Sequence, residues 1–76
     1  MITIFTKDNC VFCTRAKRFL TSRNINFTEY QLGVHFEMDM ILETYPSMKT
    51  YPIIVKDDVL IGGYSDLISG EYDGLN

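Results

Sequence analysis

The fold is decided by residues 2–23, which read ITIFTKDNCVFCTRAKRFLTSR. Ile2–Thr6 is rich in β-branched and aromatic residues, so we expect a strand there. A short polar run ends this strand, and the segment from about Val11 to Arg23 is built from helix formers. Two cysteines, Cys10 and Cys13, therefore fall where a strand turns into a helix.

The predicted helix has an apolar face and a basic face. Its apolar positions follow the spacing i, i+4, i+7, i+8, which predicts a packed stripe made of Phe12, Ala16, Phe19 and Leu20. Residues 1–24 carry five basic and one acidic side chain, whereas residues 25–76 carry two basic and nine acidic ones. Both cysteines thus lie in the basic third of an acidic chain.

The rest of the chain alternates strands with helices. Residues 27–32 alternate as a strand does, and a strand, helix, strand unit predicts parallel pairing. Residues 52–56 and 59–61 flank two aspartates and predict an antiparallel hairpin. A second helix before Pro46 is indicated by helical spacing of Val34, Met38, Ile41, Leu42 and Tyr45.

A third, short helix is expected near the carboxyl end. Ser65 and Asp66 are good N-cap residues, and Ile68, Tyr72 and Leu75 share one helical face that we expect to cover the sheet. The predicted fold class is therefore α/β: a four-stranded mixed sheet packed with three helices, formed by residues 1–76 as a single domain. Sheets of this kind place their chemistry at the carboxyl ends of strands.

Composition excludes several classes of protein. The net charge of −3 argues against a nucleic-acid binder. No apolar run approaches the roughly 20 residues needed to span a bilayer, so we expect neither membrane insertion nor export. Two cysteines can form at most one disulfide, which does not fit the dense frameworks of small secreted domains. We therefore expect the protein to reside in the reducing cytosol.

The two cysteines are placed for thiol chemistry. Cys10 lies at the helix tip, where free N–H groups, the helix dipole and the nearby Lys7 favour a thiolate, whereas Cys13 is expected to be more buried. A stabilised thiolate is above all a better leaving group when a mixed disulfide is resolved. The alternatives are two buried small apolar residues or half of a zinc site in a homodimer.

Three segments resemble glutaredoxins. Residues 6–17, TKDNCVFCTRAK, resemble the active-site segment of that family, in which Cys-Pro-Tyr-Cys follows a Thr-Lys pair. Thr50-Tyr51-Pro52 resembles the family's Thr-Val-Pro loop, and residues 61–67, IGGYSDL, resemble its Ile-Gly-Gly-Cys-Ser-Asp-Leu segment. Order and spacing agree over nearly the whole chain, which is far more specific than a lone pair of cysteines.

The resemblance implies a thioredoxin-like fold and roles for individual residues. Cys10 would attack and Cys13 would resolve, with glutathione as reductant and co-substrate. A cis peptide at Tyr51-Pro52 would face Cys10. The implied glutathione site consists of Lys7, Phe12, Thr50, Tyr51, Pro52, Gly63, Tyr64, Ser65 and Asp66.

Within that implied site, each end of glutathione has its own partners. The backbone N–H groups of Tyr64, Ser65 and Asp66 would bind the γ-glutamyl carboxylate, the carboxylate of Asp66 would pair with the ammonium group, and Lys7 would hold the glycine carboxylate. A plain helix cap is the alternative for Ser65 and Asp66.

The resemblance implies a monomeric dithiol glutaredoxin that reduces protein disulfides or glutathione mixed disulfides, with ribonucleotide reductase among its substrates. Val11 and Phe12 depart from the usual Pro and Tyr between the cysteines. These departures leave two alternatives open: a redoxin served by thioredoxin reductase, and a carrier of a 2Fe–2S cluster held by Cys10 of two chains and two glutathione thiols. A purely structural adaptor is a further alternative. We expect no metal site in the monomer and assign no role to His35.

Overall fold

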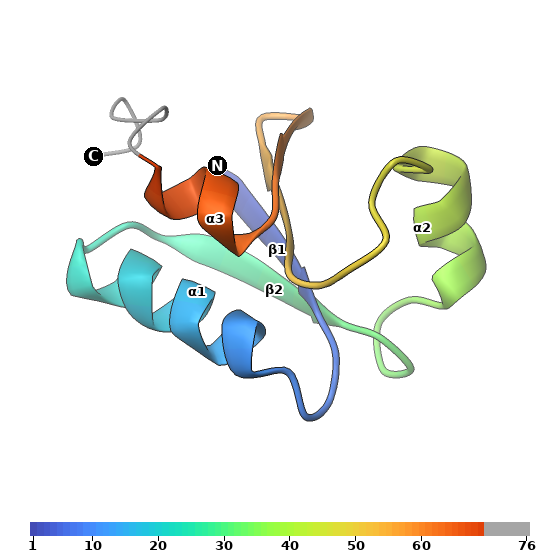
Figure 1. The fold of residues 1–76 in the computed structure, drawn as a ribbon, viewed down its shortest axis with the longest axis horizontal. Helices are drawn as coiled ribbons and strands as arrows, with labels where there is room; N and C mark the ends of the chain where they lie inside the picture. Colours follow the sequence, from blue (N-terminus) through green and yellow to red (C-terminus); the bar gives the residue numbers. More distant parts are fainter. Residues whose placement is uncertain (70–76) are drawn as a thin grey trace.

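The computed structural model describes residues 1–69, in which strands alternate with helices along the chain (Figure 1). The elements are β1 (Ile2–Thr6), α1 (Val11–Ser22), β2 (Phe27–Gln31), α2 (Met38–Thr44), β3 (Ile53–Lys56), β4 (Val59–Gly62) and α3 (Tyr64–Ile68). This arrangement is the thioredoxin-like fold, and it confirms the predicted mixed sheet with helices packed on it. Within residues 1–69, no helix is both long and apolar enough to cross a membrane.

The four strands lie in the order β2-β1-β3-β4. β1 pairs in parallel with β2, from Ile2 opposite Phe27 to Thr6 opposite Gln31, and antiparallel with β3. β3 and β4 form the predicted antiparallel hairpin. Both aspartates of its turn adopt positive φ, +48° at Asp57 and +68° at Asp58, a conformation that short polar side chains tolerate.

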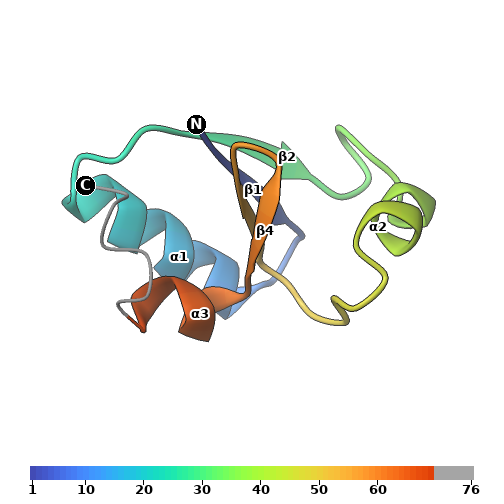
Figure 2. The same cartoon turned by 90° about the horizontal axis from the view of Figure 1, so that it is seen from above.

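The sheet buries apolar side chains on both faces. Ile2, Ile4 and Ile54 point to one face, where they pack against Ala16 and Leu20 of α1 and Leu67 of α3. The opposite face carries Phe5, Ile53 and Val55, which pack against Phe36 and Ile41. Figures 1 and 2 show α1 and α3 side by side, with α2 standing apart from them. Alternation along β1 and β3 thus divides the core into two clusters.

The buried stripe of α1 differs from the predicted one. Its fully buried residues are Cys13, Ala16 and Leu20, whereas Phe19 is half-buried and Phe12 is 51% exposed. The packed face is therefore rotated by about one residue, because the small apolar Cys13 points inward. Phe12 of α1 instead faces Tyr64 of α3, with ring centroids 5.6 Å apart.

The second helix begins later than the spacing predicts. Val34 is 68% exposed and lies in a turn, in which Gly33 adopts a φ of +84° and the N–H groups of Val34 and His35 donate to the carbonyl of Gln31. This turn uses the residues assigned to the first helical turn, so α2 begins only at Met38. Of the predicted stripe, only Ile41 is fully buried.

The third helix begins earlier than predicted, because its N-cap is Gly63 and the expected N-cap residues Ser65 and Asp66 lie inside its first turn. It also presents a different residue to the core. Leu67 is buried and Ile68 is 44% exposed, whereas we expected Ile68 to face the sheet. The difference arises because α3 begins at Tyr64, which turns Leu67 toward the sheet. The other two predicted packing positions, Tyr72 and Leu75, lie outside the described residues.

The two glycines before α3 are not equivalent. Gly62 has a φ of +133°, and the carboxylate of Asp66 occupies the space that a Cβ at this position would need. Gly63 has an ordinary φ of −98° and serves as the N-cap, with the carbonyl oxygen of Pro52 3.7 Å from the position of a Cβ. The turn therefore requires glycine at position 62 but not at position 63.

Candidate active site

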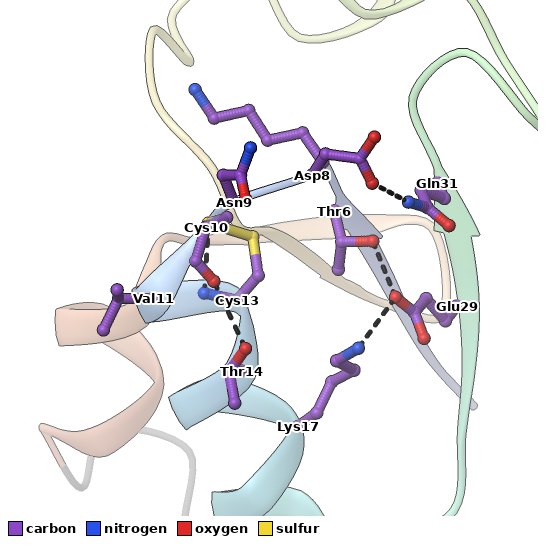
Figure 3. Close-up of a pocket in the computed structure, with 11 residues that line it drawn as sticks. Thr6, Asp8, Asn9, Cys10, Val11, Cys13, Thr14, Lys17, Glu29 and Gln31 are labelled. Carbon is purple, nitrogen blue, oxygen red and sulfur yellow. Dashed lines mark hydrogen bonds and ion pairs between the residues drawn. A yellow bond between two sulfur atoms is a disulfide. The ribbon is translucent and has the colours of Figure 1, made fainter.

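Cys10 and Cys13 form a disulfide at the start of α1, with their Cα atoms 5.2 Å apart (Figure 3). Cys10 is the N-cap of the helix, and its Sγ accepts a hydrogen bond from the backbone N–H of Cys13 at 3.1 Å. The preceding residue, Asn9, has a φ of +55°, which turns the chain from β1 into the helix. The predicted position of Cys10 at the helix tip is thus confirmed.

The two sulfurs differ in accessibility. Cys10 is partly exposed, whereas Cys13 is only 2% exposed. No acidic residue occupies the first turn of α1. An anionic sulfur at position 10 would therefore face a free N–H group and the positive end of the helix without a neighbouring negative charge in that turn.

The Tyr51-Pro52 peptide bond is cis, as the resemblance to glutaredoxins implied. The carbonyl oxygen of Tyr51 lies 3.7 Å from the Sγ of Cys10, so this loop does face the attacking sulfur. The ammonium of Lys7 lies 5.8 Å from the centroid of the Tyr51 ring. Burial raises the pKa of the Tyr51 phenol, and its buried hydroxyl has no hydrogen-bond partner within residues 1–69.

An open groove of about 530 Å³ adjoins this loop and the start of α3. We call it the aromatic groove; it is lined by Phe12, Met48, Thr50, Tyr51, Gly63, Tyr64, Ser65, Asp66 and Ile68. The groove brings together all but two of the residues predicted to bind glutathione. The exceptions are Lys7, which reaches only the Tyr51 ring, and Pro52, which is fully buried.

Asp66 has a structural role at the edge of the aromatic groove. Its carboxylate accepts a hydrogen bond from the backbone N–H of Gly63 at 3.0 Å and so caps α3. The side chain is nevertheless exposed, and Ser65 beside it is exposed as well. Asp66 therefore caps the helix from its third position, not as the N-cap residue that the sequence predicted, while its contact with an ammonium group stays a prediction.

A second hollow, of about 580 Å³, lies on the other side of the cysteines and is drawn in Figure 3. We call it the polar pocket; it is lined by Thr6, Lys7, Asp8, Asn9, Cys10, Val11, Cys13, Thr14, Lys17, Glu29 and Gln31. The carboxylate of Glu29 accepts a hydrogen bond from Thr6 at 2.7 Å and pairs with Lys17 at 3.1 Å. The Gln31 amide donates to the carboxylate of Asp8.

The charges in the polar pocket neutralise one another. Burial alone would raise the pKa of Glu29, but the hydrogen bonds from Thr6 and Lys17 and the charge of Lys17 outweigh it and hold that pKa below its usual range. Glu29 is therefore a weak base at neutral pH. It joins β2 to α1 underneath the cysteines.

Comparison with known proteins agrees with this geometry. The glutaredoxin family model matches residues 2–61. The chain belongs to the glutaredoxin family. It is 32% identical over 66 residues to glutaredoxin 3 of Escherichia coli, a match that covers 87% of this chain and 80% of the relative. It is 29% identical over 65 residues to the glutaredoxin-like protein NrdH of Lactococcus lactis subsp. cremoris, covering 84% and 88% of the two chains.

A solved structure supports the same assignment. Glutaredoxin 1 from Francisella tularensis, in complex with cacodylate, superposes with a TM-score of 0.80 at 26% identity, over 99% of this chain and 95% of that chain. This glutaredoxin is therefore a thiol-disulfide oxidoreductase, and Cys10 and Cys13 are its redox-active pair. The predicted family and enzyme class are confirmed.

Sequence reasoning missed the polar half of the site in this glutaredoxin. Thr6, Lys17, Glu29 and Gln31 were not assigned to it, yet all four line the polar pocket. One signal was available. Every second residue of a strand lies on the same face, so Glu29 on β2 had to face the same side as the apolar Phe27, toward α1. A carboxylate on the packed side of a strand calls for a cation nearby.

The described residues give neither a metal cluster nor a catalytic contact for His35. Within residues 1–69, no group of three or more His, Cys, Asp or Glu side chains lies close enough to hold a metal ion. His35 accepts a hydrogen bond on Nδ1 from the backbone N–H of Gln31 at 2.9 Å, so this nitrogen supports the 31–36 turn. Its aromatic neighbour is Tyr30, 5.9 Å away between ring centroids.

Proposed function

We propose that this protein is a dithiol glutaredoxin that uses glutathione to reduce protein disulfides and glutathione mixed disulfides. The observation that supports the proposal best is the aromatic groove, which collects predicted glutathione-binding residues from α1, the Tyr51 loop and α3 next to Cys10. Its aromatic walls suit the apolar stem of the tripeptide, and its hydroxyl and backbone groups suit the polar ends.

The first half of the reaction oxidises the cysteine pair. The thiolate of Cys10 attacks one sulfur of the substrate disulfide, which forms a mixed disulfide and releases the other sulfur as a thiolate that takes a proton from water. Cys13 loses its proton to water and attacks the sulfur of Cys10, which releases the second substrate thiol. The product is the Cys10–Cys13 disulfide, the oxidation state of the structure.

The second half returns the pair to the dithiol. The thiolate of one glutathione attacks the sulfur of Cys10, which forms a glutathione mixed disulfide and frees Cys13. A second glutathione attacks the sulfur of the bound one, which releases glutathione disulfide and the thiolate of Cys10. Two glutathione molecules thus supply the two electrons, and a separate reductase would regenerate them from NADPH.

In this proposal, the residues around Cys10 hold the tripeptide in line with the attacking sulfur. The backbone of Tyr51 pairs with its extended chain, as a neighbouring strand would. Ser65 and the start of α3 receive the γ-glutamyl carboxylate, Asp66 receives the ammonium group, and Lys7 receives the glycine carboxylate. Asp66 can cap the helix with one oxygen and present the other to the ligand.

The proposal extends to cellular context. Dependence on glutathione places the protein in the cytosol, where that thiol is kept reduced. Family resemblance makes ribonucleotide reductase a candidate substrate, and we propose that the protein acts as a monomer. A second candidate function is that of a redoxin served by thioredoxin reductase; it is favoured by the similarity to the NrdH protein and by Val11 at the position of the usual proline.

One experiment separates these functions. NADPH oxidation is followed with the purified protein and a small mixed disulfide, with glutathione and glutathione reductase in one reaction and thioredoxin reductase alone in another. We expect turnover only in the first reaction and its loss in the Cys10→Ser variant. Turnover only with thioredoxin reductase would contradict the use of glutathione, and silence in both, with visible absorption from the purified protein, would favour the 2Fe–2S carrier.

A further inference from the structure

Three arginines lie exposed along α1 and its end: Arg15, Arg18 and Arg23. Two of them line an open groove of about 330 Å³ on the α1–α3 side of the molecule; we call this groove, with Arg23, the arginine stripe. The groove is lined by Arg15, Arg18, Phe19, Ser22 and Tyr64. Tyr64 also lines the aromatic groove, so the two hollows meet at this ring.

The arginine stripe carries unneutralised charge. In the part of the chain that the structure describes, the ion pairs join Lys17 to Glu29 and the N-terminal ammonium to Asp57, and neither involves an arginine. Two guanidinium groups lie over aromatic rings instead: Arg15 is 5.4 Å from the centroid of Phe12, and Arg23 is 4.4 Å from that of Phe19. A ring orients a guanidinium but leaves its N–H donors free.

The stripe is aligned with the reacting sulfur. α1 begins directly after Cys10, and a helix rises about 1.5 Å per residue, so Arg15 and Arg18 lie roughly 8 and 12 Å along the axis from Cys10. An extended chain advances about 3.3 Å per residue. A segment that continues from a cysteine bound to Cys10 would therefore reach both arginines within about two to four residues.

We propose that the arginine stripe docks an acidic segment of the protein substrate, two to four residues from its reacting cysteine. The proposal rests on the proposed reduction of protein disulfides and adds the kind of substrate preferred. Residues 25–76 carry two basic and nine acidic side chains, so most of the chain repels an acidic partner, whereas the basic residues of 1–24, the arginine stripe among them, attract it. Such an uneven field orients a partner more than it tightens binding.

The activity test uses two peptides of eight residues with a single cysteine, each supplied as its symmetric disulfide. One carries glutamate at the second, third and fourth positions after the cysteine, and the other carries glutamine there. With glutathione and glutathione reductase, we expect kcat/KM of the wild-type protein to be about fivefold higher for the glutamate peptide at low salt. Salt of about 0.5 M should remove most of this preference.

Variants locate the source of the preference. Arg15→Gln combined with Arg18→Gln should abolish it and leave kcat/KM for the glutamine peptide unchanged. Arg18→Gln alone should reduce it, whereas Lys56→Gln, which removes the same charge, should not. Lys56 is a matched control because it pairs with Ile2, at the end of β1 opposite to the cysteines. A double variant that keeps the preference would overturn the proposal.

A binding test separates failure of docking from failure of the proposed function. The same peptides with serine in place of cysteine are titrated into the oxidised protein labelled with ¹⁵N. We expect the glutamate peptide, and not the glutamine peptide, to shift the amide signals of residues 15–23. Equal shifts or none would overturn the proposal even if turnover with glutathione is found, and selective shifts would support it even if turnover is not.

Discussion

Two hollows flank the same pair of cysteines and differ in what their polar groups do. In the polar pocket, Glu29 binds Thr6 and Lys17, and Asp8 binds Gln31. In the aromatic groove, the side chains of Ser65 and Asp66 are exposed. Both carboxylates of the pocket are bound within it, whereas the groove presents exposed polar side chains to a ligand.

This difference indicates that the polar pocket supports the fold and that the aromatic groove binds the ligand. A network whose donors and acceptors are already matched gains little from a ligand, but it fixes the elements that carry it. Groups left unpaired beside aromatic walls gain most when a ligand supplies their hydrogen bonds. We therefore expect changes in the groove to affect the KM for glutathione and changes in the pocket to affect stability.

The largest effect should come from the cysteine pair, which lines the polar pocket and adjoins the aromatic groove. Cys10→Ser should lower turnover of a glutathione mixed disulfide by at least about 10³-fold, because the attacking sulfur is lost. Cys13→Ser should keep most of that activity, since glutathione itself can resolve the mixed disulfide, but should lose reduction of protein disulfides. The coupled NADPH assay measures both, and equal losses in the two variants would contradict the assigned roles.

The next largest effect should come from the wall of the aromatic groove. Tyr64→Leu removes the ring that faces Phe12 and lines the groove, so we expect the KM for glutathione to rise about tenfold with a smaller change in kcat. Tyr30→Leu is the matched control, because this exposed tyrosine on β2 lines neither hollow. An equal rise in both variants would remove the distinction between groove and remaining surface.

The polar pocket should respond in stability instead. Glu29→Gln should lower the free energy of unfolding by roughly 1 kcal/mol at pH 7 and leave the KM for glutathione within about twofold. Because the folded-state pKa of Glu29 is lowered, its contribution is complete above the ordinary carboxyl pKa and is lost as pH falls through the folded-state value. The gap between wild type and variant should therefore narrow below about pH 4.

Urea unfolding at pH 7 and pH 3 measures that gap. Glu43→Gln is the control, since Glu43 is exposed on α2 and forms no ion pair among residues 1–69. A gap that stayed constant between these pH values would show that Glu29 acts through shape and not through its charge.

The smallest effect should come from a single unpaired hydroxyl. Ser65→Ala should raise the KM for glutathione about threefold without a measurable change in stability, because only a ligand hydrogen bond is lost. In Ser69→Ala, the lost hydroxyl bonds the carbonyl of Asp66 and does not line the groove, so we expect no change in KM. Identical KM values for wild type and Ser65→Ala would limit the binding role to aromatic and backbone groups.

The sequence predicted this architecture well where local patterns decide it. The strands, the hairpin turn at Asp57-Asp58 and the position of Cys10 all depend on alternation, turn residues or a helix start. The start of α2 could not be predicted, because Val34 fits a helical stripe and only the closing of the 31–36 turn excludes it. Phe12 likewise fits the stripe of α1, yet its neighbour Tyr64 is 52 positions away.

The site divides in the same way. Seven of the nine residues that line the aromatic groove were found through family resemblance, because they sit in recognisable motifs, whereas Met48 and Ile68 lie outside these motifs and were missed. The polar pocket was missed because Lys17 and Glu29 are ordinary surface residue types that become partners only when α1 packs on β2. Contacts between two elements depend on how the helices and strands pack against each other. The spacing of residues along a single element does not determine that packing.

The two glycines before α3 leave different freedom to mutation. Any side chain at position 62 would displace the carboxylate of Asp66, and with it the hydrogen bond that fixes the start of α3 at the aromatic groove. Position 63 has room for a methyl group and an ordinary φ. Substitutions that keep the fold should thus be rarer at 62, where the positive φ and the carboxylate of Asp66 both exclude a side chain, than at 63. The neighbouring glycines Gly62 and Gly63 are therefore under unequal evolutionary constraint.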